Sequence, residues 1–148
     1  MGKKLDSVFF EGAIPAEFLA EVIGTYRVKS GTGGHTVFMG QVRADEVEGK
    51  TVSAIEFSTY ASMAHEKLKE IRKEAFEKYP LHDLHVFHST GRVEVGEICF
   101  VVFVSAERRK FIYKATEEIV ERIKSEVPIF GKEIFEDESH QWKVNTDG

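Results

Sequence analysis

The apolar run at residues 98–104, which directly follows a tight turn, constrains the fold more than any other stretch of this chain. Its residues are almost all apolar, which is typical of a strand that is covered on both faces. The Val95-Gly96 pair before it is far too short for a crossover connection, so the flanking strands, near residues 84–93 and 97–105, are expected to be antiparallel. The sequence therefore predicts an antiparallel sheet with helices packed against it.

Three segments show the spacing of apolar side chains that predicts amphipathic helices. The first begins at Pro15, a favourable first-turn residue, and the second covers residues 61–79 and ends at Pro80. The third follows Ser105, which we expect to cap it, with Glu107 in its first turn. The expected inward-facing residues are Phe18, Leu19, Val22, Ile23 and Tyr26, then Ala64, Leu68, Ile71, Ala75 and Tyr79, and then Ile112, Ala115, Ile119 and Ile123.

The order of the elements favours an α+β fold. Two strands, residues 35–43 and 51–60, precede the second helix, and residues 134–135 and 141–143 are expected to form a short C-terminal hairpin. Paired strands between helices indicate an α+β sandwich rather than a doubly wound parallel sheet. Because no linker or internal repeat is visible, residues 1–148 are predicted to form a single domain with an antiparallel sheet and three main helices.

Composition excludes several classes of function. The net charge of −5 argues against nucleic acid as the main partner, because phosphate backbones require a basic surface. No apolar run approaches transmembrane length, so we expect no membrane partner. The only cysteine, Cys99, allows no internal disulfide and lies in the apolar run, so a buried thiol and a cytoplasmic location are expected.

Two lysines flank a proline corner and are the first candidates for chemistry. Lys124 ends the third helical pattern, Pro128 prevents the helix from continuing, and Lys132 follows the corner. Such a corner can hold a lysine in a partly dry pocket, where its ammonium group binds anions strongly. The competing interpretation is that both lysines are ordinary solvated side chains.

Three arginines occupy the ends of predicted elements. Arg43 ends a strand and could clamp a phosphate or carboxylate, or it could form a surface ion pair with Asp45 or Glu46. Arg108 and Arg109 lie where a strand passes into a helix, a position that attracts anions. A solvated turn, with Glu107 as the local partner of these arginines, is the alternative.

Histidines 82, 85 and 88 do not have metal-ligand geometry. On a strand, this spacing places His82 and His88 on one face and His85 on the other, so no metal site is predicted. His88 alone could be an acid/base or an orienting group, although a structural role is the competing interpretation. No P-loop, dinucleotide-binding motif or nucleophile elbow is present. If the basic side chains converge, they form an anion pocket for a phosphorylated or carboxylate-bearing substrate, with a lysine as acid/base or nucleophile.

Several motifs taken together resemble the large, catalytic subunit of molybdopterin synthase, over about residues 12–144. Their order and spacing agree, although each alone would be weak. The motifs are Phe38-x-Gly-x-Val-Arg43, His88-x-x-Gly91, Val104-Ser-Ala-x-Arg-Arg109 and Lys124-x-x-Val-Pro-Ile-Phe-x-Lys-Glu133, followed by Trp142.

The resemblance implies an α/β hammerhead fold and a homodimer that forms the core of a heterotetramer. It implies a small ubiquitin-like sulfur carrier at each end, whose C-terminal Gly-Gly thiocarboxylate enters the pocket. Two such sulfurs would convert cyclic pyranopterin monophosphate (precursor Z) into the dithiolene of molybdopterin, with no cofactor of the protein's own. By this resemblance Lys124 is catalytic, and Arg43 and Arg109 hold the substrate phosphate or the carrier terminus, with Arg108 and His88 as further substrate-binding candidates.

The chain also departs from the family pattern. Gly131 stands at the usual position of a second lysine, so Lys132 becomes the candidate that replaces it. The histidine of the usual Ser-Ala-His-Arg motif is absent, which leaves the register of Arg108 and Arg109 open. A non-catalytic scaffold that binds the carrier and senses anions is therefore the alternative function, and a different phosphate-handling enzyme is a third.

Overall fold

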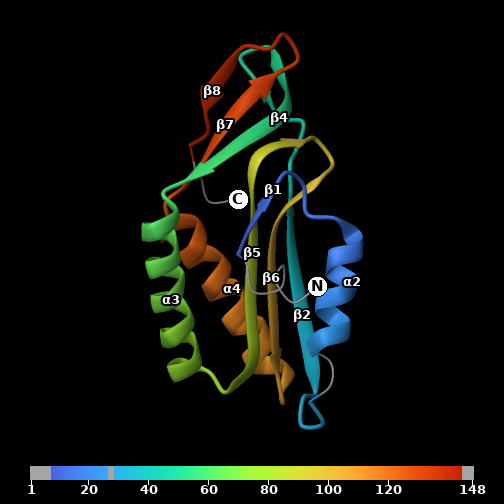
Figure 1. The fold of residues 1–148 in the computed structure, drawn as a ribbon, viewed down its shortest axis with the longest axis vertical. Coiled ribbons are helices and arrows are strands. Elements are labelled where there is room, and N and C mark those ends of the chain that lie inside the picture. The colour runs from blue at the N-terminus through green and yellow to red at the C-terminus, as the bar shows by residue number, and fades with distance from the viewer. Residues whose placement is uncertain (1–7, 27–28, 145–148) are drawn as a thin grey trace.

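A computed structural model describes residues 8–26 and 29–144 of the chain (Figure 1). Its elements, in chain order, are β1 (Phe9–Glu11), α2 (Ala16–Tyr26), β2 (Gly34–Gln41), β3 (Glu46–Val47), β4 (Lys50–Thr59), α3 (Ala61–Lys78), β5 (Leu81–Glu94), β6 (Ile98–Ala106), α4 (Arg109–Glu126), β7 (Ile129–Phe135) and β8 (His140–Trp142). None of the helices in these ranges is long and apolar enough to cross a membrane.

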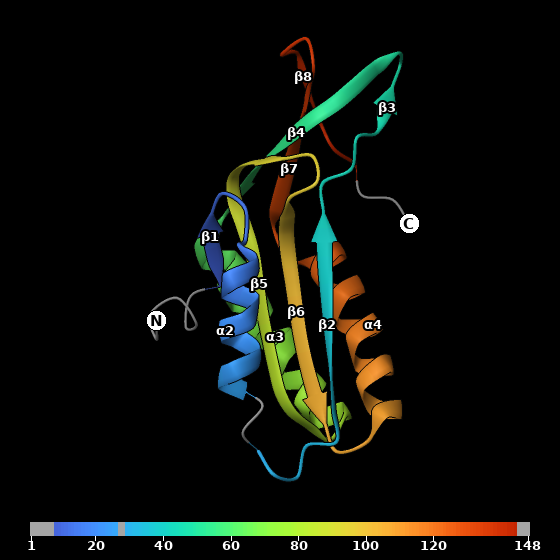
Figure 2. The ribbon, with the colours of Figure 1, turned by 90° about the vertical axis from the view of Figure 1, so that its right-hand side faces the viewer.

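The described strands form one sheet that helices cover on both faces. Its main path has the order β2-β6-β5-β4-β7-β8, while β1 pairs with β5 and β3 with β4. All of these pairs are antiparallel except β1 with β5. Helix α2 lies on one face, whereas α3 and α4 lie on the other, and β4, β7 and β8 extend beyond the helices (Figures 1 and 2). The predicted α+β class, with a mainly antiparallel sheet and three helices, is confirmed.

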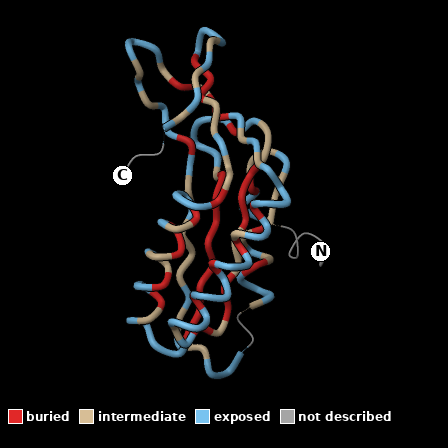
Figure 3. Tube along the Cα trace, turned by 90° about the vertical axis from the view of Figure 1, so that its left-hand side faces the viewer, coloured by how far each residue is buried: buried red, intermediate tan, exposed pale blue. Residues whose placement is uncertain are grey.

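Strands β5 and β6 form the centre of the molecule. All residues of β6 after Ile98 are buried, as the apolar run predicts. Phe87, Val101 and Phe103 face α2, whereas Val102 and Val104 pack on the opposite side, toward α3 and α4. Figure 3 shows the buried residues along these strands and on the inner sides of the helices. The Val95-Gly96 turn joins the two strands, and Gly96 has a φ of +90°, a conformation that glycine adopts without strain.

The predicted inward faces of the helices are mostly confirmed. In α3 and α4 the predicted stripes are buried, apart from Tyr79, which is partly buried at the end of α3. In α2, Phe18 and Val22 are buried, but Ile23 is 47% exposed, so its inward assignment is wrong. The spacing of apolar residues in the sequence predicts a wide apolar face for α2. It does not show that only Phe18 and Val22, near the centre of that face, are buried and that Ile23 lies at its edge.

Ser105 does not cap the last helix, contrary to the prediction. It is fully buried at the end of β6, where its Oγ donates to Asp83 Oδ2 at 3.0 Å. Lys29 Nζ donates to the other oxygen of the same carboxylate at 2.9 Å. Helix α4 begins later, with Arg108 at the N-cap position and no side-chain cap, and no acidic residue lies in its first turn. The Ser105 hydroxyl, which the local sequence predicts as the cap of α4, therefore donates to the buried carboxylate of Asp83 instead.

Candidate active site

Lys124 lies in the last turn of α4, directly before the predicted proline corner. The helix ends with Val127 in an extended conformation, and Pro128 leads into β7. Helix C-termini carry partial negative charge, which favours a cation at this position. The Lys124 side chain is exposed, and its Nζ lies 5.9 Å from the centroid of the Phe100 ring. The proline corner is confirmed, but residues 8–26 and 29–144 do not by themselves enclose Lys124 in a dry pocket.

An aromatic row crosses the sheet beneath Lys124. It consists of five residues, one from each of five strands: Gly40, Phe100, His88, Phe57 and Gly131. Phe100 is the cross-strand partner of both Gly40 and His88, and Phe57 is the partner of Gly131. The His88 ring lies 5.2 Å from the Phe100 ring and 5.0 Å from the Phe57 ring, centroid to centroid. The row therefore forms a closely packed floor on the side of the sheet that faces α4.

His88 is a buried, neutral member of this row. Burial, together with the charge of Lys124, lowers its pKa to about 4, although a hydrogen bond with Ser89 opposes the shift. Its Nδ1 lies 2.8 Å from the backbone oxygen of Ser89. Because a carbonyl oxygen can only accept, Nδ1 carries the proton, and Nε2 keeps a free lone pair. His88 is thus an acceptor near Lys124 rather than a second cation.

Gly131 and Lys132 point to opposite faces of β7. An ideal Cβ at Gly131 would lie 3.0 Å from Ile55 Cγ2 and 3.4 Å from Phe57 Cε1, so this position faces the aromatic row, and a side chain here would require its neighbours to shift. Since side chains alternate along a strand, Lys132 points away from the row. Its Nζ pairs there with Glu56 Oε1 at 3.2 Å. The fold therefore does not bring Lys132 to Lys124.

Arg43 lies beyond the end of β2, not within the strand as predicted. It follows the Gly40 end of the strand, which is the end near Phe100 and Lys124. Its side chain is 64% exposed, and its Nε lies 3.3 Å from Asp45 Oδ1. The surface ion pair that the sequence offered as the alternative is thus present, and such pairs are weak enough to open for a ligand.

Arg108 and Arg109 lie at the opposite end of α4 from Lys124. Arg109 and Lys124 are fifteen residues apart, about 22 Å along the helix axis. Both arginines are exposed, and Arg108 Nε lies 3.4 Å from Glu107 Oε1, as the solvated-turn alternative predicts. Within the described part of one chain, α4 therefore separates these two arginines from Lys124, and the condition for a single-chain anion pocket is not met there.

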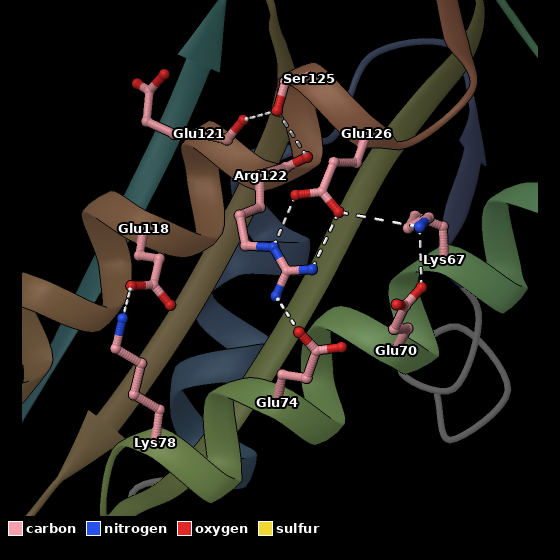
Figure 4. Close-up of polar contacts among 9 residues, drawn as sticks. All are labelled: Lys67, Glu70, Glu74, Lys78, Glu118, Glu121, Arg122, Ser125 and Glu126. Carbon is pink, nitrogen blue, oxygen red and sulfur yellow. Dashed lines mark hydrogen bonds and ion pairs between the residues drawn. The ribbon is translucent and has the colours of Figure 1, made fainter.

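Ion pairs between α3 and α4 fix the helix turn that carries Lys124. Arg122 binds both oxygens of Glu126 at 2.8 and 3.0 Å, and its third nitrogen lies 3.1 Å from Glu74 Oε1 of α3 (Figure 4). Lys67 of α3 also approaches Glu126, at 4.0 Å. Arg122 is largely shielded by its neighbours, so this bidentate pair stabilises the last turn of α4 against α3.

Two hollows in the described part of the chain lie away from the predicted cations. One, of about 470 Å³, lies between α3 and β5 and is bordered by Tyr26, Arg72 and His85. The other, of about 290 Å³, is lined by Ser58, Thr59, Tyr60, Phe130 and Trp142. None of the predicted site lysines and arginines borders either hollow.

The histidines separate as the strand period predicts. His85 stacks on Tyr26 of α2 with ring centroids 3.7 Å apart, whereas His88 packs on Phe57 and Phe100 on the other side of the sheet. Among the described residues, no three His, Cys, Asp or Glu side chains are grouped as metal ligands. Cys99 is buried, and this burial raises the pKa of its thiol to about 11, so it is a poor nucleophile.

The aromatic row is the feature of the site that sequence reasoning missed. The two-residue period of residues 51–60 places Ile55 and Phe57 on one face of a strand, which the structure confirms through their common approach to Gly131. The period cannot show that Phe57 meets His88, because that contact depends on which distant strands pair.

Comparison with known proteins gives one family. The model of the MoaE protein family matches residues 15–126. The molybdopterin synthase catalytic subunit of Pyrococcus abyssi is 35% identical over 128 residues, which are 86% of this chain and 85% of that protein. The crystal structure of molybdopterin synthase from Staphylococcus aureus superposes with a TM-score of 0.79 at 32% identity, covering 93% of this chain and 96% of that one.

A more distant structure has the same fold. It is the complex of subunits 1 and 2 of molybdopterin-converting factor from Helicobacter pylori, with a TM-score of 0.77 at 19% identity over 90% of this chain and 87% of that one. The family that the motifs predicted is confirmed by the sequence matches over most of the chain. This protein belongs to the MoaE family, that of the molybdopterin synthase catalytic subunit.

Proposed function

We propose that this protein transfers sulfur from the C-terminal thiocarboxylate of a small ubiquitin-like carrier to precursor Z, as the catalytic subunit of a molybdopterin synthase. Membership of the MoaE family supports this reaction. The observation that carries the assignment to a site is the position of Lys124, on the last turn of α4 above the aromatic row. The proposal treats the chain as one domain, and it keeps the cytoplasm as the location.

The chemistry requires cations because both reactants are anions. A thiocarboxylate and a cyclic phosphate repel one another, and a nearby ammonium or guanidinium group offsets this repulsion and stabilises charge in the transition state. In the proposal, the thiocarboxylate sulfur attacks a carbon of precursor Z and the C–O bond of that carbon breaks, with Lys124 protonating the departing oxygen. Water then hydrolyses the thioester that joins carrier and substrate, which leaves the sulfur on the substrate and a carboxylate on the carrier. Arg43 binds a substrate anion after its pair with Asp45 opens. Lys132 is not assigned a catalytic role, because it points away from the row toward Glu56.

A second copy of the chain explains how Arg108 and Arg109 could take part. Strand β2 is an edge of the sheet and pairs only with β6 among the described residues. It runs beside α4 from Gly34, whose ideal Cβ would lie 3.3 Å from Ile112 Cδ1, to Gly40, which pairs with Phe100 near Lys124. Figure 2 shows β2 and α4 side by side along their length.

An open edge strand can pair with its own copy across a two-fold axis. Antiparallel pairing of two β2 strands would place the Gly34 end of one beside the Gly40 end of the other. The arginines at the start of α4 in one copy would then lie near Lys124 and Arg43 of its partner. The proposed site is therefore shared between two chains, which is consistent with the exposure of each cation in one chain.

The carrier is the second proposed partner. The Helicobacter pylori structure is a complex of two subunits of molybdopterin-converting factor, which supports an equivalent small subunit for this chain. With one carrier at each of two shared sites, the proposed assembly is a heterotetramer around a homodimeric core.

A turnover assay tests the proposal. The purified protein is mixed with thiocarboxylated carrier and precursor Z, and formation of the dithiolene is followed. We expect product from the wild type, a loss of at least about a hundredfold in rate for Lys124→Ala, and a nearly unchanged rate for Lys132→Met as the matched lysine control. Tight carrier binding without product would favour the non-catalytic scaffold, and an unchanged rate for Lys124→Ala would remove Lys124 from catalysis.

A further inference from the structure

Lys124 and His88 both approach the Phe100 ring of the aromatic row. His88 and Phe100 are direct cross-strand partners with rings 5.2 Å apart, and the Nζ of Lys124 lies 5.9 Å from the same Phe100 ring. The side of the row beyond His88 is closed by Phe57 and by the backbone of Gly131. The imidazole is therefore the one polar ring in the floor beneath Lys124.

We propose that His88 is a positioning residue for Lys124, whose ammonium group donates a hydrogen bond to the bare Nε2 of the imidazole. This inference deepens the proposed sulfur transfer and depends on it for its catalytic consequence. His88, as a neutral hydrogen-bond acceptor, would then orient the Lys124 ammonium group. In this chain glycine, packed against Ile55 and Phe57, occupies position 131 and provides no second amine. No bond forms or breaks at His88 in this role.

The geometry fixes the imidazole for this role. The Nδ1 proton is committed to the Ser89 carbonyl oxygen at 2.8 Å, so the ring cannot exchange its donor and acceptor nitrogens without losing that bond. Edge contact with Phe57 and tilted contact with Phe100 restrict rotation of the ring. Only 8% of the residue is exposed, so little of the imidazole is open to water.

The electrostatic surroundings agree with an acceptor. Lys124 of α4 is the only charged side chain among the described residues that contributes to the pKa shift of His88, and it lowers that pKa as burial does. On β6, the nearby Cys99 thiol stays protonated because burial raises its pKa to about 11. His88 is therefore neutral at pH 7 and remains able to accept a hydrogen bond from Lys124.

A first experiment tests the contact without turnover. Nitrogen-15 NMR of the full-length protein should show His88 as the Nδ1–H tautomer. We expect Lys124→Gln to raise the titration midpoint of His88 by about half a pH unit or more, which is about threefold in proton affinity. Lys114→Gln, an exposed lysine earlier on the same helix, is the matched control and should leave the midpoint unchanged. The Nε2–H tautomer, or an unmoved midpoint in Lys124→Gln, would overturn the proposal.

A second experiment tests the consequence for the reaction. His88→Phe keeps a ring in the row but removes the acceptor, and we expect about a tenfold or larger fall in kcat with little change in KM for precursor Z. His88→Gln restores an acceptor and should recover part of the rate. Wild-type kcat in His88→Phe, or equal losses in both variants, would contradict a positioning role. If the wild type makes no dithiolene, the proposed function fails, while the NMR experiment still decides whether His88 and Lys124 are in contact.

Discussion

Gly131 determines which side chains can surround Lys124. Its Cβ position points at Ile55 and Phe57, so the absence of a side chain is favoured by packing against the row. A lysine at this position would require Ile55, and Phe57 beside it, to move away from its Cβ. Glycine at position 131, in place of the usual lysine, therefore fits the close packing of Ile55 and Phe57. Without that lysine, the imidazole of His88 is the polar side chain of the row.

Replacement of Gly131 by alanine tests this packing directly. We expect Gly131→Ala to lower the free energy of unfolding by about 1–3 kcal/mol, because its Cβ would lie 3.0 Å from Ile55 Cγ2. Gly24→Ala is the matched control. Gly24 is helical and exposed and has nothing near its Cβ position, so alanine should stabilise by about 0.5–1 kcal/mol. Urea denaturation measures both, and equal effects of the two changes would refute the close approach.

Sequence could predict the individual candidates but not their neighbours. The proline corner at Pro128 and the exposed ion pair of Arg43 with Asp45 follow from local chemistry, and both are present. The face of Lys132 could not be predicted, because β7 was expected to begin only at Ile134. Because β7 in fact begins at Ile129, Gly131 and Lys132 both lie within the strand and point to opposite faces of the sheet. The strand includes residues 129–133 because they pair with β4, which the local sequence does not show.

The C-terminal turn of α4 depends on its attachment to α3. Arg122 bridges Glu126 on its own helix and Glu74 on the next, and it is mostly covered by these neighbours. The arginine lowers the pKa of Glu126, chiefly by hydrogen bonding. The attachment thus holds the helix turn that presents Lys124 to the row.

Loss of this attachment should weaken the fold and the site together. We expect Arg122→Met to destabilise the protein by about 1 kcal/mol, because the bidentate pair with Glu126 and the bond to Glu74 join two helices, which an isolated exposed pair does not. Arg108→Met, which removes an exposed arginine whose ion pair among the described residues is with adjacent Glu107, is the control and should not change stability measurably. Thermal denaturation compares the two variants, and a stable Arg122→Met protein would show that apolar packing alone fixes the turn.

The long elements could be predicted from sequence because their periods are local. Helix α3 and the β5–β6 hairpin lie within a few residues of the predicted bounds. Strand β1 was missed, since three residues show no period, and its parallel pairing with β5 becomes favourable only in the folded sheet. Ser105 is a second example of a contact that forms only in the folded sheet. Its hydroxyl donates to Asp83 on the neighbouring strand and does not cap α4.

At the scale of the whole molecule, buried His88 and partly buried His85 should make the fold sensitive to acid. Burial lowers the pKa of His85 and of His88 to about 4, whereas both titrate near 6.5 when the chain unfolds. The unfolded chain therefore binds more protons than the folded chain between these values, and stability falls as pH decreases from 6.5 toward 4. We expect a slope of up to about 1.4 kcal/mol per pH unit for each histidine.

Urea titrations between pH 6.5 and 5.5, where few carboxylates are protonated, measure this slope. His88→Gln should remove about half of it, because one of the two imidazoles is then absent. His140→Gln, at an exposed position, is the matched control for loss of one histidine. A free energy of unfolding that stays constant over this interval would show that the imidazoles can be protonated in the folded protein.

Sequence could not predict how the cations are assembled, because it does not say which chain supplies each one. The sequence motifs indicate that Arg109 and Lys124 belong to one anion-binding site, yet α4 separates the two residues by about 22 Å within a chain. The outer edge of β2, which pairs with no further strand in the described part of the chain, offers a physical way to bring them together through a second copy. The central claim is thus that the active site lies between two chains.

Complementation between two inactive variants tests this claim most directly. Lys124→Ala and Arg109→Ala chains are refolded together in equal amounts with the carrier, and dithiolene formation is measured. Half of the random dimers are mixed, and each mixed dimer holds one intact shared site, so about a quarter of wild-type activity should return. No recovery in mixed dimers whose formation is verified would contradict a shared site, because both defects would then act within their own chains.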